Sequence, residues 1–315
     1  MEALKKADLD FLFKGGSSLM LIFEVPKRLS TDVDILVPTD CEIGPYIQKA
    51  SGFFPFLSVQ ESVRTSSKSI SKKHYKFTYL SPIRNRPITV LLDVLFAENH
   101  YAKTLIKPIR NPFLLSEGND LSVKIPSPES ILGDKLTAFA PHTIGVRYFN
   151  DDFSNDKRLE VMKQLFDVVS LLDIASDFAD VRIAYFAIAK QEISYRNIDV
   201  TPVDCLMDSF QTALALLSWG KFGKEDYRNL VEGTNRIRMH IVNQSFSMNA
   251  TALYAAKTML LSACLIQNAD FFHQGIKRQN PLTEAPYNKI NFILKNKEQE
   301  AFDIAVTALK YLGMV

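Results

Sequence analysis

The sequence predicts an α+β protein in which a mixed sheet with helices is followed by an all-helical C-terminal part. Short β-branched runs at 33–37 and 88–96, bounded by turn-forming or charged residues, indicate strands in the first half. From residue 156 onward, apolar residues recur almost throughout at helical spacing. The polar, loop-like stretch 141–155 separates the two patterns, and this change of pattern predicts two domains.

Two further strands are expected in the first half. The segment 74–80 alternates in the way that a half-buried strand does. The segment 120–125 forms a fourth strand, because Pro126 follows it and a proline cannot continue a sheet ladder.

A helix is predicted after these strands, with Ser127 as its N-cap and Pro128 in its first turn, and Pro141 ends it. We place the domain boundary in the loop after this helix, which gives domains of residues 1–145 and 146–315. The second domain is expected to contribute an Asp-bearing helix to the functional site. Its predicted helices begin at 156 and continue over 178–196, 202–219, 225–244, 249–274 and 296–312.

The composition excludes several classes of protein. The chain has 315 residues, a formal charge of +2 and 47% hydrophobic residues, which is enough apolar material for real cores and excludes a disordered chain. Its three cysteines form no C-x-x-C pair, so they predict core residues and neither a zinc site nor a disulfide framework.

We expect a cytoplasmic protein that makes no contact with a membrane. The first sixteen residues lack the apolar core of a secretory signal. The most apolar later stretch, 250–269, contains Lys257 and several amides, so we expect it to fall short of the roughly 20 apolar residues of a membrane span.

Gly15, Gly16 and Ser17 stand between an apolar lead and an apolar helical stretch. Glycines let the backbone approach a phosphate, and the start of a helix offers free N–H groups to an anion. A turn that merely joins two elements is the alternative.

Asp32 and Asp34 open the strand that continues to Val37. Residues two apart on a strand share a face, so both carboxylates should point the same way while Val33 and Ile35 point into the core. Mg²⁺ held by these oxygens and by substrate phosphates would relieve their repulsion. A solvated acidic start of a strand is the alternative.

Asp93 interrupts the apolar strand 88–96. A buried carboxylate is costly unless it is paired or bound to a metal. Asp93 is therefore either the partner of a nearby Lys or Arg, or a third metal-binding acid beside Asp32 and Asp34 in a two-metal site for displacement at phosphorus.

The segment 61–110 contains ten lysines and arginines against three acidic residues, interleaved with aromatic residues. Such a segment suits a nucleic-acid backbone, and a solvated surface has the same composition. The basic residues are Arg64, Lys68, Lys72, Lys73, Lys76, Arg84, Arg86, Lys103, Lys107 and Arg110.

The Gly15-Gly16-Ser17-x-Leu19 motif and the later Leu29-Ser30-x-Asp32-x-Asp34 motif resemble the opening of the nucleotidyltransferase superfamily. More narrowly, they resemble the AbiEii/AbiGii toxins of type IV toxin–antitoxin pairs, to which the MenT toxins are related. The run 133–141 resembles the lysine helix of that family, and 163–167 resembles its later Asp-bearing helix. The likeness covers about residues 11–175.

The resemblance implies a nucleotidyltransferase fold and a role for each matching residue. Gly15, Gly16 and Ser17 would hold a nucleoside triphosphate, and Asp32 and Asp34 would bind Mg²⁺. Lys135 would contact phosphates or promote the transfer. Asp167 would complete the site.

The implied activity is Mg²⁺-dependent transfer of NMP from an NTP to a hydroxyl of RNA, such as a tRNA 3′ end, or of protein. The chain would be the toxin of a pair with an antitoxin partner. A small-molecule nucleotidyltransferase of the aminoglycoside-modifying kind and an inactive nucleotide-binding module are the alternatives.

Overall fold

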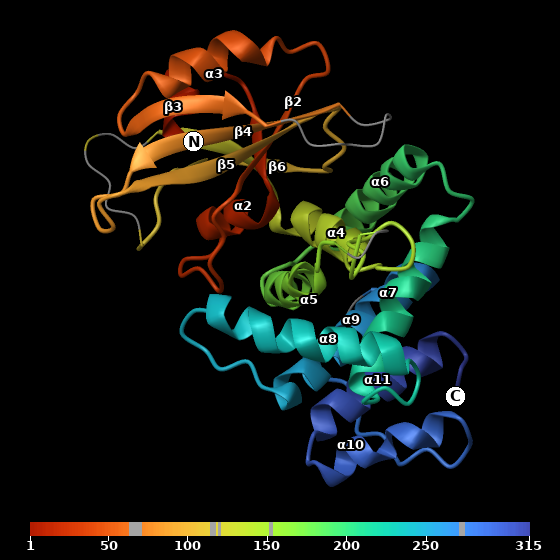
Figure 1. Cartoon of the computed structure of the whole chain (residues 1–315). Helices are drawn as coiled ribbons and strands as arrows, with labels where there is room; N and C mark the ends of the chain where they lie inside the picture. The colour runs from red at the N-terminus through yellow and green to blue at the C-terminus, as the bar shows by residue number, and fades with distance from the viewer. Residues whose placement is uncertain (63–70, 114–117, 119–120, 151–153, 271–274) are drawn as a thin grey trace. The chain divides into compact units, whose positions relative to one another are not determined.

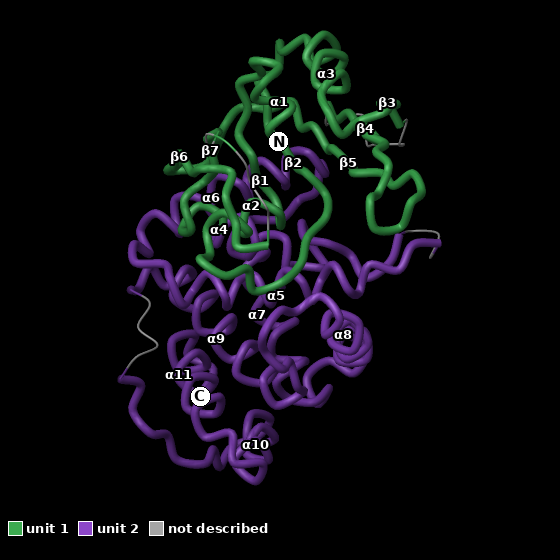
Figure 2. The backbone as a smooth tube through the Cα atoms, turned by 90° about the vertical axis from the view of Figure 1, so that its left-hand side faces the viewer, with its two compact units in different colours: residues 1–131 green, residues 132–315 purple. Residues whose placement is uncertain are grey.

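The computed structural model describes residues 1–62, 71–113, 118, 121–150, 154–270 and 275–315 (Figure 1). The chain divides into two compact units, residues 1–131 and 132–315 (Figure 2). The division falls within helix α4, Pro128–Ala138, whereas the sequence analysis places the domain boundary in the loop after this helix. The assignment of functional domains stays a prediction.

Unit 1 contains a mixed seven-stranded sheet in the order β3-β4-β5-β2-β1-β7-β6. The pairs β2–β5 and β1–β7 are parallel, and the other neighbours are antiparallel. The strands are β1 Leu12–Lys14, β2 Val33–Val37, β3 Phe56–Glu61, β4 Lys72–Leu80, β5 Pro87–Phe96, β6 Thr104–Pro108 and β7 Ser122–Pro126.

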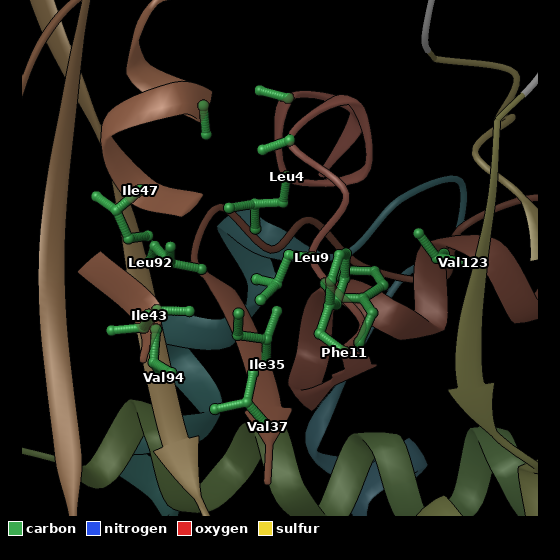
Figure 3. Packing of buried hydrophobic residues seen from close by; sticks show 14 of the residues in the cluster. Leu4, Leu9, Phe11, Ile35, Val37, Ile43, Ile47, Leu92, Val94 and Val123 are labelled. Atoms are coloured by element: carbon green, nitrogen blue, oxygen red, sulfur yellow. The ribbon is translucent and has the colours of Figure 1, made fainter. Parts of the chain in front are cut away.

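One face of this sheet carries the main core of unit 1. Ile35 of β2 and Val94 of β5 are buried there against α1, Glu2–Lys6, and α3, Ile43–Ser51 (Figure 3). Residues that alternate with them lie on the opposite face, where Leu36 packs in a second, smaller apolar cluster. The alternation of β2 and β5 therefore leaves Asp34 and Asp93 on the face opposite the main core.

The four predicted strands are all present. β2 matches 33–37 in full, while β4 and β5 begin slightly earlier than 74 and 88. The strand predicted at 120–125 is β7, and its first predicted residue, Asp120, lies outside the described residues. The mixed sheet with helices and the helical C-terminal part confirm the predicted fold class.

The predicted start of α4 is confirmed, because the Ser127 hydroxyl accepts a hydrogen bond from the Ser130 backbone N–H at 3.2 Å. Unit 2 is helical. The further helices are α5 Arg158–Leu172, α6 Phe178–Arg196, α7 Pro202–Leu217, α8 Lys224–Ile237, α9 Met248–Gln267, α10 Phe292–Lys295 and α11 Gln299–Tyr311. Short 3₁₀ helices span Arg238–His240 and Tyr287–Asn291.

Two predicted helices are shorter in the structure. The helix predicted to reach 244 ends at Ile237, and the chain becomes extended at Ile241. The helix predicted over 249–274 ends at Gln267, because Asn268 takes a left-handed conformation that closes the helix (φ 53°). Residues 271–274 of that prediction lie outside the described residues.

Helix α9 differs from the expectation in a second way. By length and composition it could cross a membrane, with a mean hydropathy of 1.2. About two thirds of this window (67%) is buried inside the structure, where α9 packs on α7 and α11, as the core helix of a compact unit does. The absence of membrane contact stays a prediction.

Gly133 of α4 marks a close approach of two helices in unit 2. A Cβ at Gly133 would lie 2.7 Å from the backbone N of Tyr185 and 3.0 Å from the carbonyl oxygen of Val181, both in α6. Because backbone atoms cannot move aside as a side chain does, the absent side chain sets the spacing of α4 and α6.

We predict that Gly133→Ala lowers the free energy of unfolding by about 1–3 kcal/mol, although alanine is the better helix former. The matched control is Gly52→Ala, at an exposed position with φ −78° whose Cβ would meet only the Lys49 carbonyl oxygen, at 3.4 Å. Gly52→Ala should leave stability unchanged or raise it by up to about 1 kcal/mol. Urea unfolding followed by circular dichroism compares the two, and equal effects would contradict the close-approach explanation.

Candidate active site

The chain turns from β1 into helix α2, which spans Gly15–Ile22. The glycine at this turn, Gly15, cannot be replaced by another residue without strain. Gly15 has φ +74°, in the left-handed region that favours glycine. A Cβ on Gly15 would also lie 2.1 Å from Oδ2 of Asp34. The turn and the Asp34 carboxylate are therefore in direct contact.

The rest of the turn is tied to the segment that enters β2. The Ser17 hydroxyl is buried and donates a hydrogen bond to the backbone carbonyl oxygen of Asp32. A Cβ on Gly16 would lie 2.6 Å from Nη2 of Arg28, whose side chain is buried. A buried guanidinium beside a glycine turn supplies positive charge next to the free N–H groups at the start of α2.

The parallel pairing of β2 with β5 places Asp34 opposite Asp93. Neighbouring strands lie about 4.8 Å apart, and opposed residues share a face, so the two carboxylates emerge side by side. On the outer sides of this pair, β1 places Lys14 opposite Asp34 and β4 places His74 opposite Asp93. We call Lys14, Asp34, Asp93 and His74 the cross-strand row.

One hydrogen-bond partner of Asp93 is a histidine. Nδ1 of His74 lies 2.7 Å from Oδ1 of Asp93. The sequence predicts a Lys or Arg partner or a metal for Asp93, and no histidine is expected at the site. The alternation of 74–80 contains the missing signal, because it puts His74 on the face opposite the buried Tyr75 and Phe77.

Asp32 lies just before β2, two residues from Asp34, and is exposed to solvent. In the part of the chain that the structure describes, no group of three or more His, Cys, Asp or Glu side chains is arranged to hold a metal ion. The donor set present, two adjacent carboxylates with a third close in sequence, suits a cation that takes further oxygen ligands from substrate phosphates. This is the usual way in which proteins bind Mg²⁺.

The remaining predicted residues meet within unit 2. Nζ of Lys135 in α4 lies 3.0 Å from Oδ2 of Asp167 in α5, and it donates to Oε1 of Gln164 at 3.2 Å. The exposed fractions of the two charged side chains are only 9% and 1%. The predicted site residues thus form one group in unit 1, at the turn and the acids, and a second group in unit 2.

The basic segment 61–110 is divided between the two faces of the sheet. Lys72 and Lys76 of β4 are exposed and alternate with Lys73 and Tyr75, so they share the face of His74 and Asp93. Lys73 lies on the opposite face, where its Nζ is 3.8 Å from Glu61. Residues 63–70 of this segment, with the basic residues Arg64 and Lys68, lie outside the described residues.

A family model matches most of the chain, and two solved structures resemble it. The family model for the nucleotidyl transferase AbiEii toxin of type IV toxin–antitoxin systems matches residues 2–244. No curated protein matches the chain. Two solved Helicobacter pylori chains, JHP933 and a candidate nucleotidyltransferase, each have 14% identity and a TM-score of 0.46. They cover 85% of this chain and 89% and 92% of their own.

The family model spans more than half of the chain and includes both the Gly-Gly-Ser turn and the aspartates of β2 and β5. The chain belongs to the AbiEii family of nucleotidyl transferase toxins of type IV toxin–antitoxin systems.

Proposed function

We propose that this nucleotidyltransferase toxin is a cytoplasmic, Mg²⁺-dependent enzyme that transfers NMP from an NTP to a hydroxyl group of RNA. The observation that carries the proposal is the side-by-side placement of Asp34 and Asp93, with the Gly15 turn in contact with Asp34. Family membership supplies the reaction class, the NTP substrate and an antitoxin partner.

In this proposal, different residues of unit 1 bind the phosphates of the NTP and the metal ion. The backbone N–H groups of Gly16 and Ser17, at the positive end of α2, bind the phosphates that leave as pyrophosphate. Asp32, Asp34 and Asp93 would hold Mg²⁺, and a bound Mg²⁺ would neutralise charge on the phosphates. Nucleotidyl transfer needs positioning and charge stabilisation more than covalent help, and these groups supply both.

The reaction joins the acceptor to the nucleotide in one displacement. The acceptor hydroxyl gives up its proton to solvent water, its oxygen forms a bond to the α-phosphorus, and the bond from this phosphorus to the bridging oxygen of pyrophosphate breaks. His74 contacts Asp93 and acts through it as a positioning residue, because the 2.7 Å contact fixes one oxygen of that carboxylate.

RNA is favoured as the acceptor over a protein or a small molecule by the lysines beside the row. Lys72 and Lys76 flank His74 on the face of Asp93, where they can contact phosphates of an RNA strand that runs along β4. A small drug or a protein side chain has no such row of phosphates for these lysines to bind.

We predict that Asp34→Asn lowers metal-dependent transfer of labelled NMP to total RNA by about 100-fold or more, because the carboxylate charge is lost while its volume beside Gly15 is kept. Asp199→Asn, at an exposed acid of unit 2, is the charge-matched control and should retain activity. Label on proteins or on an aminoglycoside instead of RNA would select an alternative acceptor. No transfer and no NTP binding by the wild-type protein would favour the inactive-module alternative.

The two faces of β4 provide a test of the RNA acceptor. Lys76→Glu should raise the KM for RNA by about tenfold and weaken its salt dependence, since a phosphate contact is lost. Lys73→Glu makes the same charge change one face away, beside Glu61, and should alter the KM for RNA little. Steady-state kinetics at two salt concentrations distinguish the cases, and equal effects of both variants would refute a face-specific RNA contact.

Lys135 and Asp167 need an experiment that separates stability from catalysis. Asp167→Ala leaves the Lys135 ammonium buried without its carboxylate and should cost about 3–5 kcal/mol of unfolding free energy. The double variant Lys135→Met with Asp167→Leu removes both charges and should be much closer to the wild type in stability. If Lys135 acts on the phosphates, the double variant is folded but inactive. A folded and fully active double variant would restrict the pair to a structural role.

A further inference from the structure

A cavity opens on the sheet face of the cross-strand row. Its volume is about 300 Å³, at the lower end of the range for small-molecule sites. Its apolar lining includes Leu12 of β1, Leu36 of β2 and Ala97, which follows β5. Leu12 and Leu36 each stand two residues from the row members of their strands, Lys14 and Asp34, so the cavity adjoins the row on the same face.

The lining of this cavity suits an uncharged, flat group. Leu12, Leu36 and Ala97 belong to one buried apolar cluster and form a base on which a ring can pack. Polar residues also line the cavity: Asp10, Thr39, Glu98, Asn99 and Lys124. Two acidic residues against one basic residue make the cavity unfavourable for a phosphate chain, whereas the amide, hydroxyl and carboxylate groups can hydrogen-bond a base or a ribose.

The Gly15 turn, the acids and the cavity follow one another along β2, with the acids in the middle. β1 runs antiparallel to β2, so the chain passes Lys14, opposite Asp34, and enters the Gly15 turn towards the start of β2. The acids come next, and the cavity lies at the far end of β2, where Pro38 and Thr39 follow the strand.

The geometry of phosphoryl transfer predicts which substrate group lies near the cavity. The attacking and leaving oxygens lie roughly in line on opposite sides of the phosphorus. With the departing pyrophosphate at the Gly15 turn, the attacking hydroxyl approaches from the opposite side of the acids, which is the side of the cavity.

We propose that this cavity binds the terminal nucleoside of the acceptor RNA, the nucleoside whose hydroxyl attacks the α-phosphorus. The assignment rests on the proposed function and adds the location of the acceptor to it. The cavity then selects the acceptor end, and the base of the incoming NTP binds elsewhere.

The test blocks the cavity from its rim. Thr39 is exposed and lines the cavity, so Thr39→Trp narrows it with little effect on the fold, and Asp40→Trp adds the same bulk at the next residue, which does not line it. The probes are single-stranded RNA heptamers with a free 3′ hydroxyl and a non-hydrolysable NTP analogue with Mg²⁺. Thr39→Trp should raise the KM for the RNA by about tenfold while the Kd of the NTP analogue stays within about twofold, and Asp40→Trp should change neither.

Two results would overturn the assignment. If Thr39→Trp weakens NTP binding and leaves the KM for RNA unchanged, the cavity holds the base of the NTP. If neither constant moves, the cavity takes no part in the reaction.

If the proposed function is wrong, the wild-type protein neither binds the NTP analogue nor transfers label. In that case calorimetry with free adenosine, cytidine, guanosine and uridine tests the cavity directly. Nucleoside binding by the wild type that is lost in Thr39→Trp supports the cavity as a nucleoside site, and the absence of binding refutes it.

Discussion

Parallel pairing of β2 with β5 in register brings two aspartates to adjacent positions on an open sheet face. Like charges directly across a sheet destabilise it, so such a pair persists only where neighbouring groups compensate. Here Lys14 lies opposite one aspartate and His74 contacts the other. The cross-strand row thus places a lysine and a histidine on either side of the two acids, so each acid has a basic neighbour on its outer side.

The main core on the other face holds this register in place. A slip of β2 by one residue against β5 would move Ile35 out of the core and bring Asp34 into it, at the cost of burying a carboxylate. The Gly15 turn adds a second constraint, because its backbone lies against Asp34 and fixes the carboxylate from the side of β1. The position of the acids is therefore a consequence of hydrophobic burial as much as of the acids themselves.

The sequence predicts those parts of the fold in which local pattern and tertiary environment agree. β2 and β5 are short β-branched runs that are buried, and they appear where the pattern places them. β3 and β6 are edge strands with largely exposed side chains, so they lack the alternation that identifies a strand. Helix α3 contains Gly44 in its first turn, which weakens its local helix signal.

The candidate site shows the same division. The motifs identify Gly15, Asp34 and Asp93 as residues able to carry chemistry. Register and three-dimensional contact, which a single sequence does not contain, are needed to bring His74 to Asp93 and Arg28 to Gly16. Lys135 and Asp167 lie in sequence segments that resemble the family. Their buried ion pair becomes visible only in the structure.

The apolar composition of helix α9 matters when unit 2 unfolds. Its 20 residues are apolar enough to cross a bilayer, yet they are mostly enclosed by other helices. Unfolding of unit 2 exposes this apolar segment, and exposed apolar surface makes an unfolded chain prone to aggregation and to capture by chaperones. Where such loss outpaces refolding, the rate at which unit 2 unfolds sets how long the folded protein lasts.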